Sequence, residues 1–408
     1  MSTAIANEKR KNKADSLVLK GTLLVASTLT VMAGATISPA LPAIRQVFAD
    51  IPNADLMVRL VLTLPALFIA LVAPIAGAII DKFGRKRLLI VSAIAYGFAG
   101  GSGYFINDIW LLLLSRALLG VAVAGVMTTV TTLIADYYTG QARSTFLGIQ
   151  AAFSGLGGFV YLSLSGILAD IGWHSPFLIY FSAFLIVPFI VTVIYEPTLR
   201  KQASNKDAMP VTDVKFPLGL MAFVYSTMLI TQIVFYAVPV QLPFYLESLV
   251  GANGAQSGLA IASLSLFFSI ASASFGWFDK RFPNLYTMLL GFTITGTGFI
   301  LLTLATGWIM LGFGLVASGF GLGLVVPNLI TWLASGVPEI LRGRALGGVT
   351  ASLFFGQFVS PFVVTPISNL VGDGGIYAVL GIFLLTFVVI AFIARHSIAR
   401  LTNTPLEK

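Results

Sequence analysis

Long stretches without a single charged residue recur along this 408-residue chain, and they limit the folds open to it. A helix needs about 20 apolar residues to cross the hydrocarbon core of a bilayer. Uncharged runs of about that length or longer lie at 117–135, 144–169, 216–246, 248–278, 282–338, 345–372 and 374–394. They lack the alternation of polar and apolar residues typical of membrane β-barrels. Since helices satisfy their own backbone polar groups in lipid, we expect an all-α membrane protein.

The apolar pattern predicts twelve membrane-spanning helices. The longest run, 282–338, is too long for one span and divides at Ala305–Gly307. The predicted spans are 21–40, 56–80, 88–105, 109–135, 145–169, 176–195, 216–239, 257–278, 285–304, 308–334, 345–370 and 376–393.

The positive charges predict the orientation of these spans. If the N-terminus is cytoplasmic, 21 of the 24 lysines and arginines fall on the cytoplasmic side, and only Arg45, Arg59 and Arg116 do not. Such an asymmetry follows the positive-inside rule and places both termini in the cytoplasm, with the protein in the cytoplasmic membrane. The net charge of +8 therefore reflects topology, and nucleic acid is not expected as a partner.

The second half of the sequence repeats features of the first. Arg342 follows Arg143 by 199 positions within similar stretches, "LRGRALG" and "ARSTFLG", and Asp279 follows Asp81 by 198. The repeat predicts two pseudo-symmetric six-helix bundles, 1–195 and 216–408, joined by a polar cytoplasmic linker, 196–215. Repeats of this kind let two rigid halves rock about a site at their interface, as in secondary transport.

One charged loop, between the spans 56–80 and 88–105, resembles a family signature. Its sequence "GAIIDKFGRKR" matches the pattern G-x-x-x-D-x-x-G-R-K/R through Gly77, Asp81, Gly84, Arg85, Lys86 and Arg87. On this motif, its degenerate copy at Asp279 and the twelve spans, the chain resembles the major facilitator superfamily. The resemblance implies the major facilitator fold and transport by alternating access.

Other stretches are similar to the twelve-helix drug–proton antiporters of that family. These are "SRALLG" with Arg116, "GWHSPF" at 172–177 and "PVQLPFYL" at 239–246. The Gly-Pro pair of the antiporter signature is missing from the span 145–169, where Tyr161-Leu162 stands instead. Export by proton antiport and import or facilitated transport of a metabolite therefore both remain open.

The resemblance also implies a role for the charged loop. Asp81 would contact the start of the span 345–370 and close the cytoplasmic side, and Arg85 would pair with Asp136. Gly84 permits a tight turn that a Cβ would hinder. We call these residues, with Gly77, Lys86 and Arg87, the conformational latch. The alternative is a loop that only fixes topology through its basic residues.

Two arginines lie within predicted spans and are functional candidates, because a charge at bilayer depth is costly. We expect Arg116 to face the central cavity, where it would bind an anionic substrate group or act on a neighbouring acid; the alternative is a side chain that reaches the headgroups. Arg59 lies one turn into its span and can reach the headgroups more easily.

Uncharged polar and aromatic residues in the second half are the other candidates for substrate contact. They are Gln232 and Tyr236, Asn328 and Trp332, and Gln357. The first four form two pairs at spacing i, i+4, so each pair shares a helix face. No carboxylate lies in the middle of a predicted span, so a coupled proton would be carried at a helix end. The candidates for that role are Asp81, Asp136 and Asp170, with His174 as a possible aid.

These features predict a secondary active transporter, most simply a proton-coupled exporter of a small amphipathic or drug-like compound. The alternative is an importer or facilitator, or an exporter of an anionic metabolite such as a siderophore-like chelator, which the two arginines would suit. The sequence contains no nucleotide-binding loop or metal-ligand cluster, so we expect neither an enzyme nor a bound cofactor. The expected partners are the substrate, protons and the lipid bilayer, and the expected state is a monomer.

Overall fold

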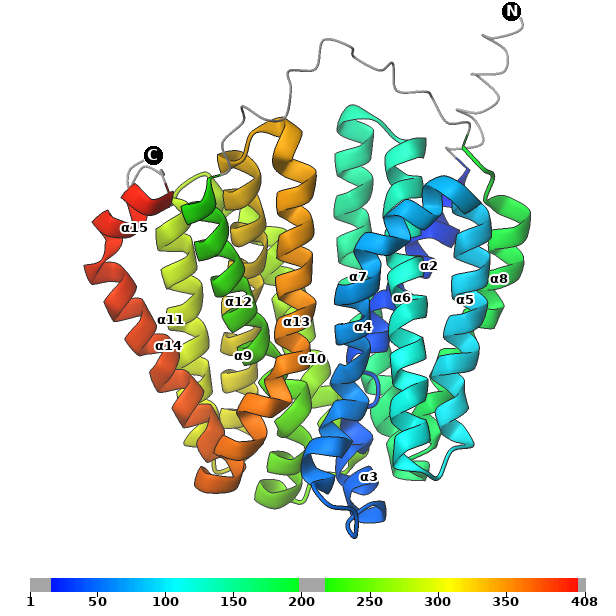
Figure 1. The fold of residues 1–408 in the computed structure, drawn as a ribbon. Helices are drawn as coiled ribbons and strands as arrows, with labels where there is room; N and C mark the ends of the chain where they lie inside the picture. The colour runs from blue at the N-terminus through cyan, green and yellow to red at the C-terminus, as the bar shows by residue number, and fades with distance from the viewer. Residues whose placement is uncertain (1–15, 198–216, 403–408) are drawn as a thin grey trace, which may run out of the picture.

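The computed structural model describes residues 16–197 and 217–402 of the chain, except for the side chains of Ala78, Asp81 and Ser144. All the regular elements of the described part are helices, and they form two groups (Figure 1). The first group contains α2 (Leu17–Ala35), η1 (Ser38–Ala40), α3 (Leu41–Val47), α4 (Ala54–Phe83), α5 (Arg85–Gly101), η2 (Ser102–Tyr104), α6 (Ile109–Tyr137), α7 (Gly140–Ile171), η3 (Ser175–Phe181) and α8 (Ser182–Val193). The second contains α9 (Leu218–Val250), α10 (Gly254–Asp279), α11 (Asn284–Thr303), α12 (Trp308–Gly336), α13 (Glu339–Val371), α14 (Gly375–Ile393) and α15 (Arg395–Thr402).

Each of the twelve predicted spans coincides with helical structure. Eleven helical segments of the described residues are long and apolar enough to cross a membrane. The twelfth is α5, whose 17 residues rise about 26 Å and are extended by η2 toward the thickness of the hydrocarbon core, about 30 Å. The prediction of an all-α membrane fold is confirmed.

The end of one span was predicted wrongly. The span 216–239 was expected to stop at Pro239, but α9 continues through Pro239 and Pro243 to Val250. Proline is tolerated inside a buried membrane helix when neighbours satisfy the backbone groups that it frees. Pro243 has no N–H to offer the carbonyl of Pro239, and that carbonyl accepts a hydrogen bond from the Ser38 hydroxyl of the other group of helices.

The helix starts follow local rules that the sequence contains. Asp108 caps α6, because its carboxylate accepts hydrogen bonds of 2.9 Å from the backbone of Trp110 and Leu111. Asn253 and Gln256 form a reciprocal capping box at the start of α10. These caps fix where two of the membrane helices begin.

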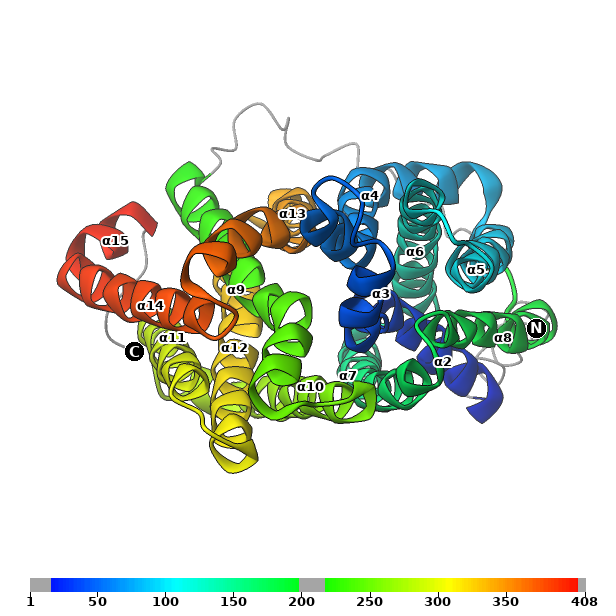
Figure 2. The same cartoon turned by 90° about the horizontal axis from the view of Figure 1, so that it is seen from below.

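The most extensive contacts between the halves are made by two helix pairs: α7 packs against α10, and α4 packs against α13 (Figures 1 and 2). The α7–α10 seam depends on glycine, because a Cβ on Gly166 would come within 2.4 Å of the Gly254 carbonyl oxygen and 3.0 Å of the Gly258 Cα. Backbones can approach this closely only where side chains are absent. The α7–α10 interface between the halves is therefore built on small residues.

Two ends of the molecule are distinguished below by their charge. The basic end holds the helix termini around Lys82–Arg87, Arg143, Lys280–Arg281 and Arg342–Arg344, and lies at the top of Figure 1. The opposite end holds the turns at 48–53, 102–108, 172–174, 251–253, 304–307 and 372–374.

Candidate functional site

The α4–α5 turn at the basic end has the geometry that its glycine predicts. Gly84 has φ +88°, a region that residues with a Cβ rarely adopt. Arg85 is buried, and its Nε lies 3.2 Å from the Asp136 carboxylate at the end of α6. The ion pair that the resemblance implied is therefore present. Lys86 donates from Nζ to the Val191 carbonyl at 2.6 Å.

The acid of the same motif is only partly described. Asp81 lies in the last turn of α4, but its side chain is outside the described residues, so its contact with the start of α13 stays a prediction. Gly77 lies one turn earlier, and no described atom is within 4 Å of where its Cβ would be. Arg87 is exposed. The packing of α4 on α13 does bring the two helices of the proposed latch together.

A carboxylate that the sequence analysis did not single out completes this turn. Glu196 follows the last helix of the first half, and it accepts hydrogen bonds from the backbone of Arg85 at 2.7 Å and Lys86 at 2.9 Å. An acid is favoured at a helix N-terminus, where backbone N–H groups lack partners. Its only sequence signal was its place at the start of the polar linker.

Glu196→Gln should reduce stability by about 0.5–2 kcal/mol, the usual range for loss of a helix cap. The amide can still accept one hydrogen bond but no longer carries the charge. Thermal unfolding of purified protein measures the effect, with Asp50→Asn, an exposed acid in the turn after α3, as the control. Equal melting temperatures for the two variants would contradict the capping role.

Arg116 does not lie where the sequence analysis placed it. It is 0% exposed and donates from Nη2 to the carbonyls of Ala99 at 2.9 Å and Gly100 at 2.7 Å, at the end of α5. Its guanidinium also stacks on the rings of Phe177 and Tyr180, at 4.9 and 5.2 Å. Both earlier interpretations, a cavity-facing group and a side chain reaching the headgroups, are wrong, because the carbonyls at the helix end provide the acceptors.

Arg59 joins the two halves instead of extending to the headgroups. It is 3% exposed and donates from Nη2 to Gln241 Oε1 of α9 at 2.8 Å. Gln241 in turn donates from Nε2 to the Asp373 carboxylate at 2.5 Å and to the Ser368 hydroxyl at 2.8 Å. The guanidinium lies 4.6 Å from the Phe244 ring centroid. Gln241 therefore bridges a buried cation and an acid at the opposite end.

A second connection between the halves lies at the same end. Asp170, at the end of α7, accepts hydrogen bonds from the backbone of Gly254 at 2.6 Å and Ala255 at 3.1 Å, the first two residues of α10. Asp170 was predicted to end a helix; that its carboxylate caps a helix of the other half was not predicted. We call the Arg59–Gln241–Asp373 and Asp170–α10 contacts together the opposite-end closure.

Three of the polar candidates in the second half lie on α9 and α13, and one of them reaches the first half. Gln357 of α13 donates to Gln232 of α9 at 3.2 Å. Tyr236, one turn after Gln232, donates to the Gly34 carbonyl of α2 at 3.1 Å. On the facing half, the hydroxyls of Thr28 and Tyr161 lie 3.2 Å apart. These groups place hydrogen-bonding side chains among apolar ones in the middle of the spans.

The other pair does not share an environment. Asn328 is 0% exposed and donates to the Asn284 carbonyl at the start of α11, inside the second half. Trp332 is 1% exposed and packs edge-on against Phe223 of α9. Both side chains contact other helices of the second half, and the prediction that they offer one face to a substrate stays a prediction.

His174 lies in the turn after α7 at the opposite end. Its Nε2 lies 2.9 Å from the Asn107 side-chain oxygen, and its ring stacks on Trp173 at 3.5 Å. Partial burial lowers its pKa below the usual value of about 6.5, so it is neutral at pH 7. We find no contact of His174 with Asp170 among the hydrogen bonds of the described residues.

A family model described as the Major Facilitator Superfamily matches residues 23–249 and 224–408. The chain belongs to the major facilitator superfamily. It is a multi-pass membrane transporter and not an enzyme.

Curated relatives within the superfamily include efflux proteins. A multi-drug resistance efflux pump PmrA homolog of Lactococcus lactis is 24% identical over 84% of this chain and 85% of its own length. The class C tetracycline resistance protein of Escherichia coli is 25% identical over 86% of this chain and 89% of its own.

Solved structures show the same fold at lower identity. A D-xylose-proton symporter matches with a TM-score of 0.74 and 16% identity, over 91% of this chain and 96% of its own. A bacterial homolog of the human lysosomal transporter Spinster, solved in an inward-facing, unoccupied conformation, matches with a TM-score of 0.74 and 17% identity, over 95% and 98%. At these identities the likeness supports the fold alone.

Proposed function

We propose that this protein is a proton-coupled exporter of small amphipathic or drug-like compounds, acting as a monomer in the cytoplasmic membrane. The observation that carries the proposal is the similarity to multidrug and tetracycline efflux proteins over more than four-fifths of the chain. The proposed orientation places the basic end, with both termini, in the cytoplasm.

The position of the contacts between the two halves supports alternating access. The proposed rigid bodies are 1–195 and 216–408, joined by the linker 196–215, of which 198–215 lies outside the described residues. The opposite-end closure, with Ser38 and Tyr236, connects them away from the basic end. This arrangement fits a state closed to the outside, from which a substrate enters from the cytoplasm. Export then requires these contacts to break.

The substrate site that we propose lies between the halves around Gln232, Gln357 and Tyr236, opposite Thr28 and Tyr161. Amides and hydroxyls set among apolar side chains suit a ligand with both kinds of surface. Arg59 and Arg116, which had suggested an anionic metabolite, are held by protein acceptors. The anion-transport alternative therefore loses the residues that favoured it.

Proton coupling is proposed from the relatives and from the available acids. The carboxylates at helix ends include Asp136, paired with Arg85, and Asp170, which caps α10. Asp81 is the third candidate carrier. Protonation of any of them would weaken a contact of the carboxylate, which gives each a way to couple protons to conformation.

The test is a drug-resistance and accumulation assay in a bacterial strain that lacks its own exporters. Expression should lower accumulation of cationic dyes or tetracycline, and a protonophore should abolish the difference. Gln232→Ala and Gln357→Ala should alter resistance with normal amounts of protein in the membrane. Accumulation that rises on expression would reverse the proposed direction.

A further inference from the structure

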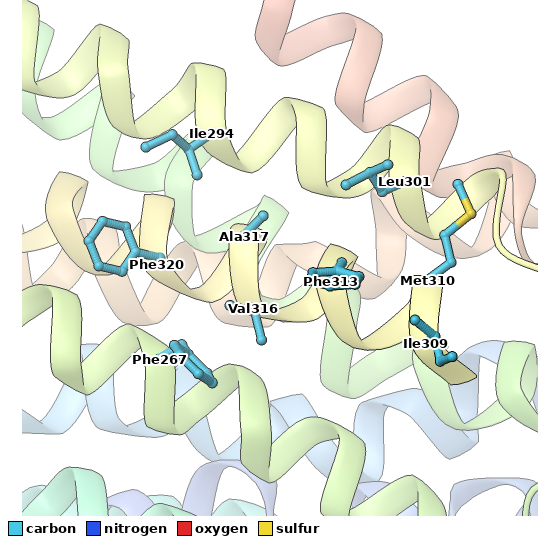
Figure 3. Close-up of a pocket in the computed structure, with 9 residues that line it drawn as sticks. All are labelled: Phe267, Ile294, Leu301, Ile309, Met310, Phe313, Val316, Ala317 and Phe320. Carbon is cyan, nitrogen blue, oxygen red and sulfur yellow. The ribbon is translucent and has the colours of Figure 1, made fainter. Parts of the chain in front are cut away.

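Two grooves on the membrane-spanning surface differ in what lies at their ends. One, of about 520 Å³, is lined by α10, α11 and α12 and holds only apolar side chains, among them Phe267, Ile309 and Phe320 (Figure 3). The other, of about 560 Å³, lies in the first half between α4, α5 and α6. These three helices run side by side along one outer edge of the first bundle (Figure 2). We call it the α4–α6 groove.

The α4–α6 groove opens outward along the membrane-spanning part of its helices. The side chains of Val91, Phe98, Leu118 and Val121 line it and are 41–64% exposed. Along α5 and η2 its lining runs from Leu88 to Ser102, about 21 Å along the helix axis. That length exceeds one leaflet of the hydrocarbon core, about 15 Å.

Basic side chains lie at the end of the groove nearest the basic end of the molecule. Lys82 follows the lining residue Ile79 by three positions on α4, and Arg87 precedes the lining residue Val91 by four positions on α5. Residues three or four apart share a helix face. Both basic side chains are exposed. The groove therefore continues, at the membrane surface, into a pair of cations.

We propose that the α4–α6 groove binds one anionic phospholipid, with an acyl chain along α5 and the phosphate between Lys82 and Arg87. Basic residues beside a membrane helix attract anionic headgroups, and an apolar groove at least one leaflet long holds the chain. The α10–α12 groove reaches Phe320, whose ring lies 6.4 Å from that of Phe278. The basic residues nearby, Lys280 and Arg281, follow the acid Asp279, and Arg281 stacks on Trp277. We therefore expect this groove to take a lipid chain without preference for the headgroup.

The proposed lipid site lies next to the residues of the proposed latch. Arg87 lies two residues after Arg85, whose Nε holds Asp136, and α4 carries both Lys82 and Asp81. A bound phosphate neutralises cations in the same turn that carries the latch acid. Lipid composition thus acts on the loop, and this part of the inference rests on the proposed transport function.

The experiment is native mass spectrometry of the purified full chain, titrated with dioleoyl phosphatidylglycerol or dioleoyl phosphatidylcholine. Phosphatidylglycerol should be retained more strongly, and Lys82→Gln should reduce its affinity about fivefold. Ala95→Trp fills the groove from an exposed position and should abolish the preference. Ala317→Trp, the same change in the α10–α12 groove, is the matched control and should leave the preference intact.

Equal retention of the two lipids, or an undiminished preference in Ala95→Trp, would overturn the proposal. If Ala95→Trp fails to fold, Ala95→Cys gives a second measurement, since the chain has no other cysteine. A fluorophore there should be quenched more by brominated phosphatidylglycerol than by brominated phosphatidylcholine. Loss of drug resistance in Ala95→Trp with unchanged lipid retention would assign the groove to the transported compound instead. Because lipid retention is measured without transport, failure of the lipid site and failure of the exporter function remain distinguishable.

Discussion

Arg116→Ala should destabilise the protein by about 4 kcal/mol while leaving transport by the folded fraction within about twofold. The substitution removes three donated hydrogen bonds, two of them to carbonyls at the end of α5, and leaves the space of a fully buried side chain. The Ala99 carbonyl keeps the Ser102 hydroxyl as a donor at 3.0 Å, but the Gly100 carbonyl loses its side-chain donor. A buried acceptor left without a partner costs about 1–3 kcal/mol, and the cavity adds to that. Thermal unfolding and transport per folded molecule, measured on reconstituted protein, give the two quantities.

Arg116→Lys separates charge from geometry in the same experiment. A lysine keeps a cation at the end of α5 but cannot reproduce the planar fork that reaches two carbonyls and stacks on two rings. Its stability should fall between those of the wild type and the alanine variant. A stable Arg116→Ala protein that no longer transports would return Arg116 to the substrate site, against its position in the structure.

Gln241→Leu should shift the protein toward a state open at the opposite end by about a hundredfold. Leucine keeps most of the volume but leaves Arg59 and Asp373 without the amide that joins them. Two charge-assisted hydrogen bonds are lost in the closed state, one from the buried Arg59 and one to the half-buried Asp373, which keep their contacts with Asp55 and Ser368. The loss costs about 3 kcal/mol, and each 1.4 kcal/mol is a factor of ten. The loss applies only to the state in which the contact exists, so the equilibrium moves.

A single introduced cysteine reports the shift, because the natural chain has none. Leu162 of α7 is 3% exposed and its backbone lies against Gly258 of α10, so Leu162→Cys is shielded while the halves are closed. Its labelling by an impermeant maleimide from outside should accelerate in Gln241→Leu. The matched control is Gln46→Leu, which loses only an exposed 3.4 Å hydrogen bond to Glu247. Equal labelling in the two variants would remove Gln241 from the closure.

The fold could be predicted nearly completely from the sequence, because a long run without charged residues identifies each membrane helix. It failed at the end of α9, where proline normally stops a helix, because the compensating donor, Ser38, lies 201 residues away. The turn at Gly84 was predictable for the opposite reason, since its chemistry is local.

The site was less predictable, because a side chain's facing depends on helix rotation. The cost of burying Arg116 was evident from the sequence, but its acceptors are backbone carbonyls, which no side-chain pattern reveals. Gln241 is an isolated polar residue in the apolar stretch "PVQLPFYL", and this was the sequence signal that could have identified it as a functional candidate. Its partners Arg59 and Asp373 lie 182 and 132 residues away.

The two contacts of the opposite-end closure should evolve under different rules. The α7–α10 contact uses backbone donors, so only Asp170 needs its chemistry, while Gly166 and Gly254 must stay small. The contact through Gln241 needs three specific side chains at once. Among diverging orthologues, the Asp170–α10 contact should therefore persist even where the side chains at the start of α10 are replaced, provided that the glycines stay small. The second should change only by coordinated replacement, so its polar partners should covary.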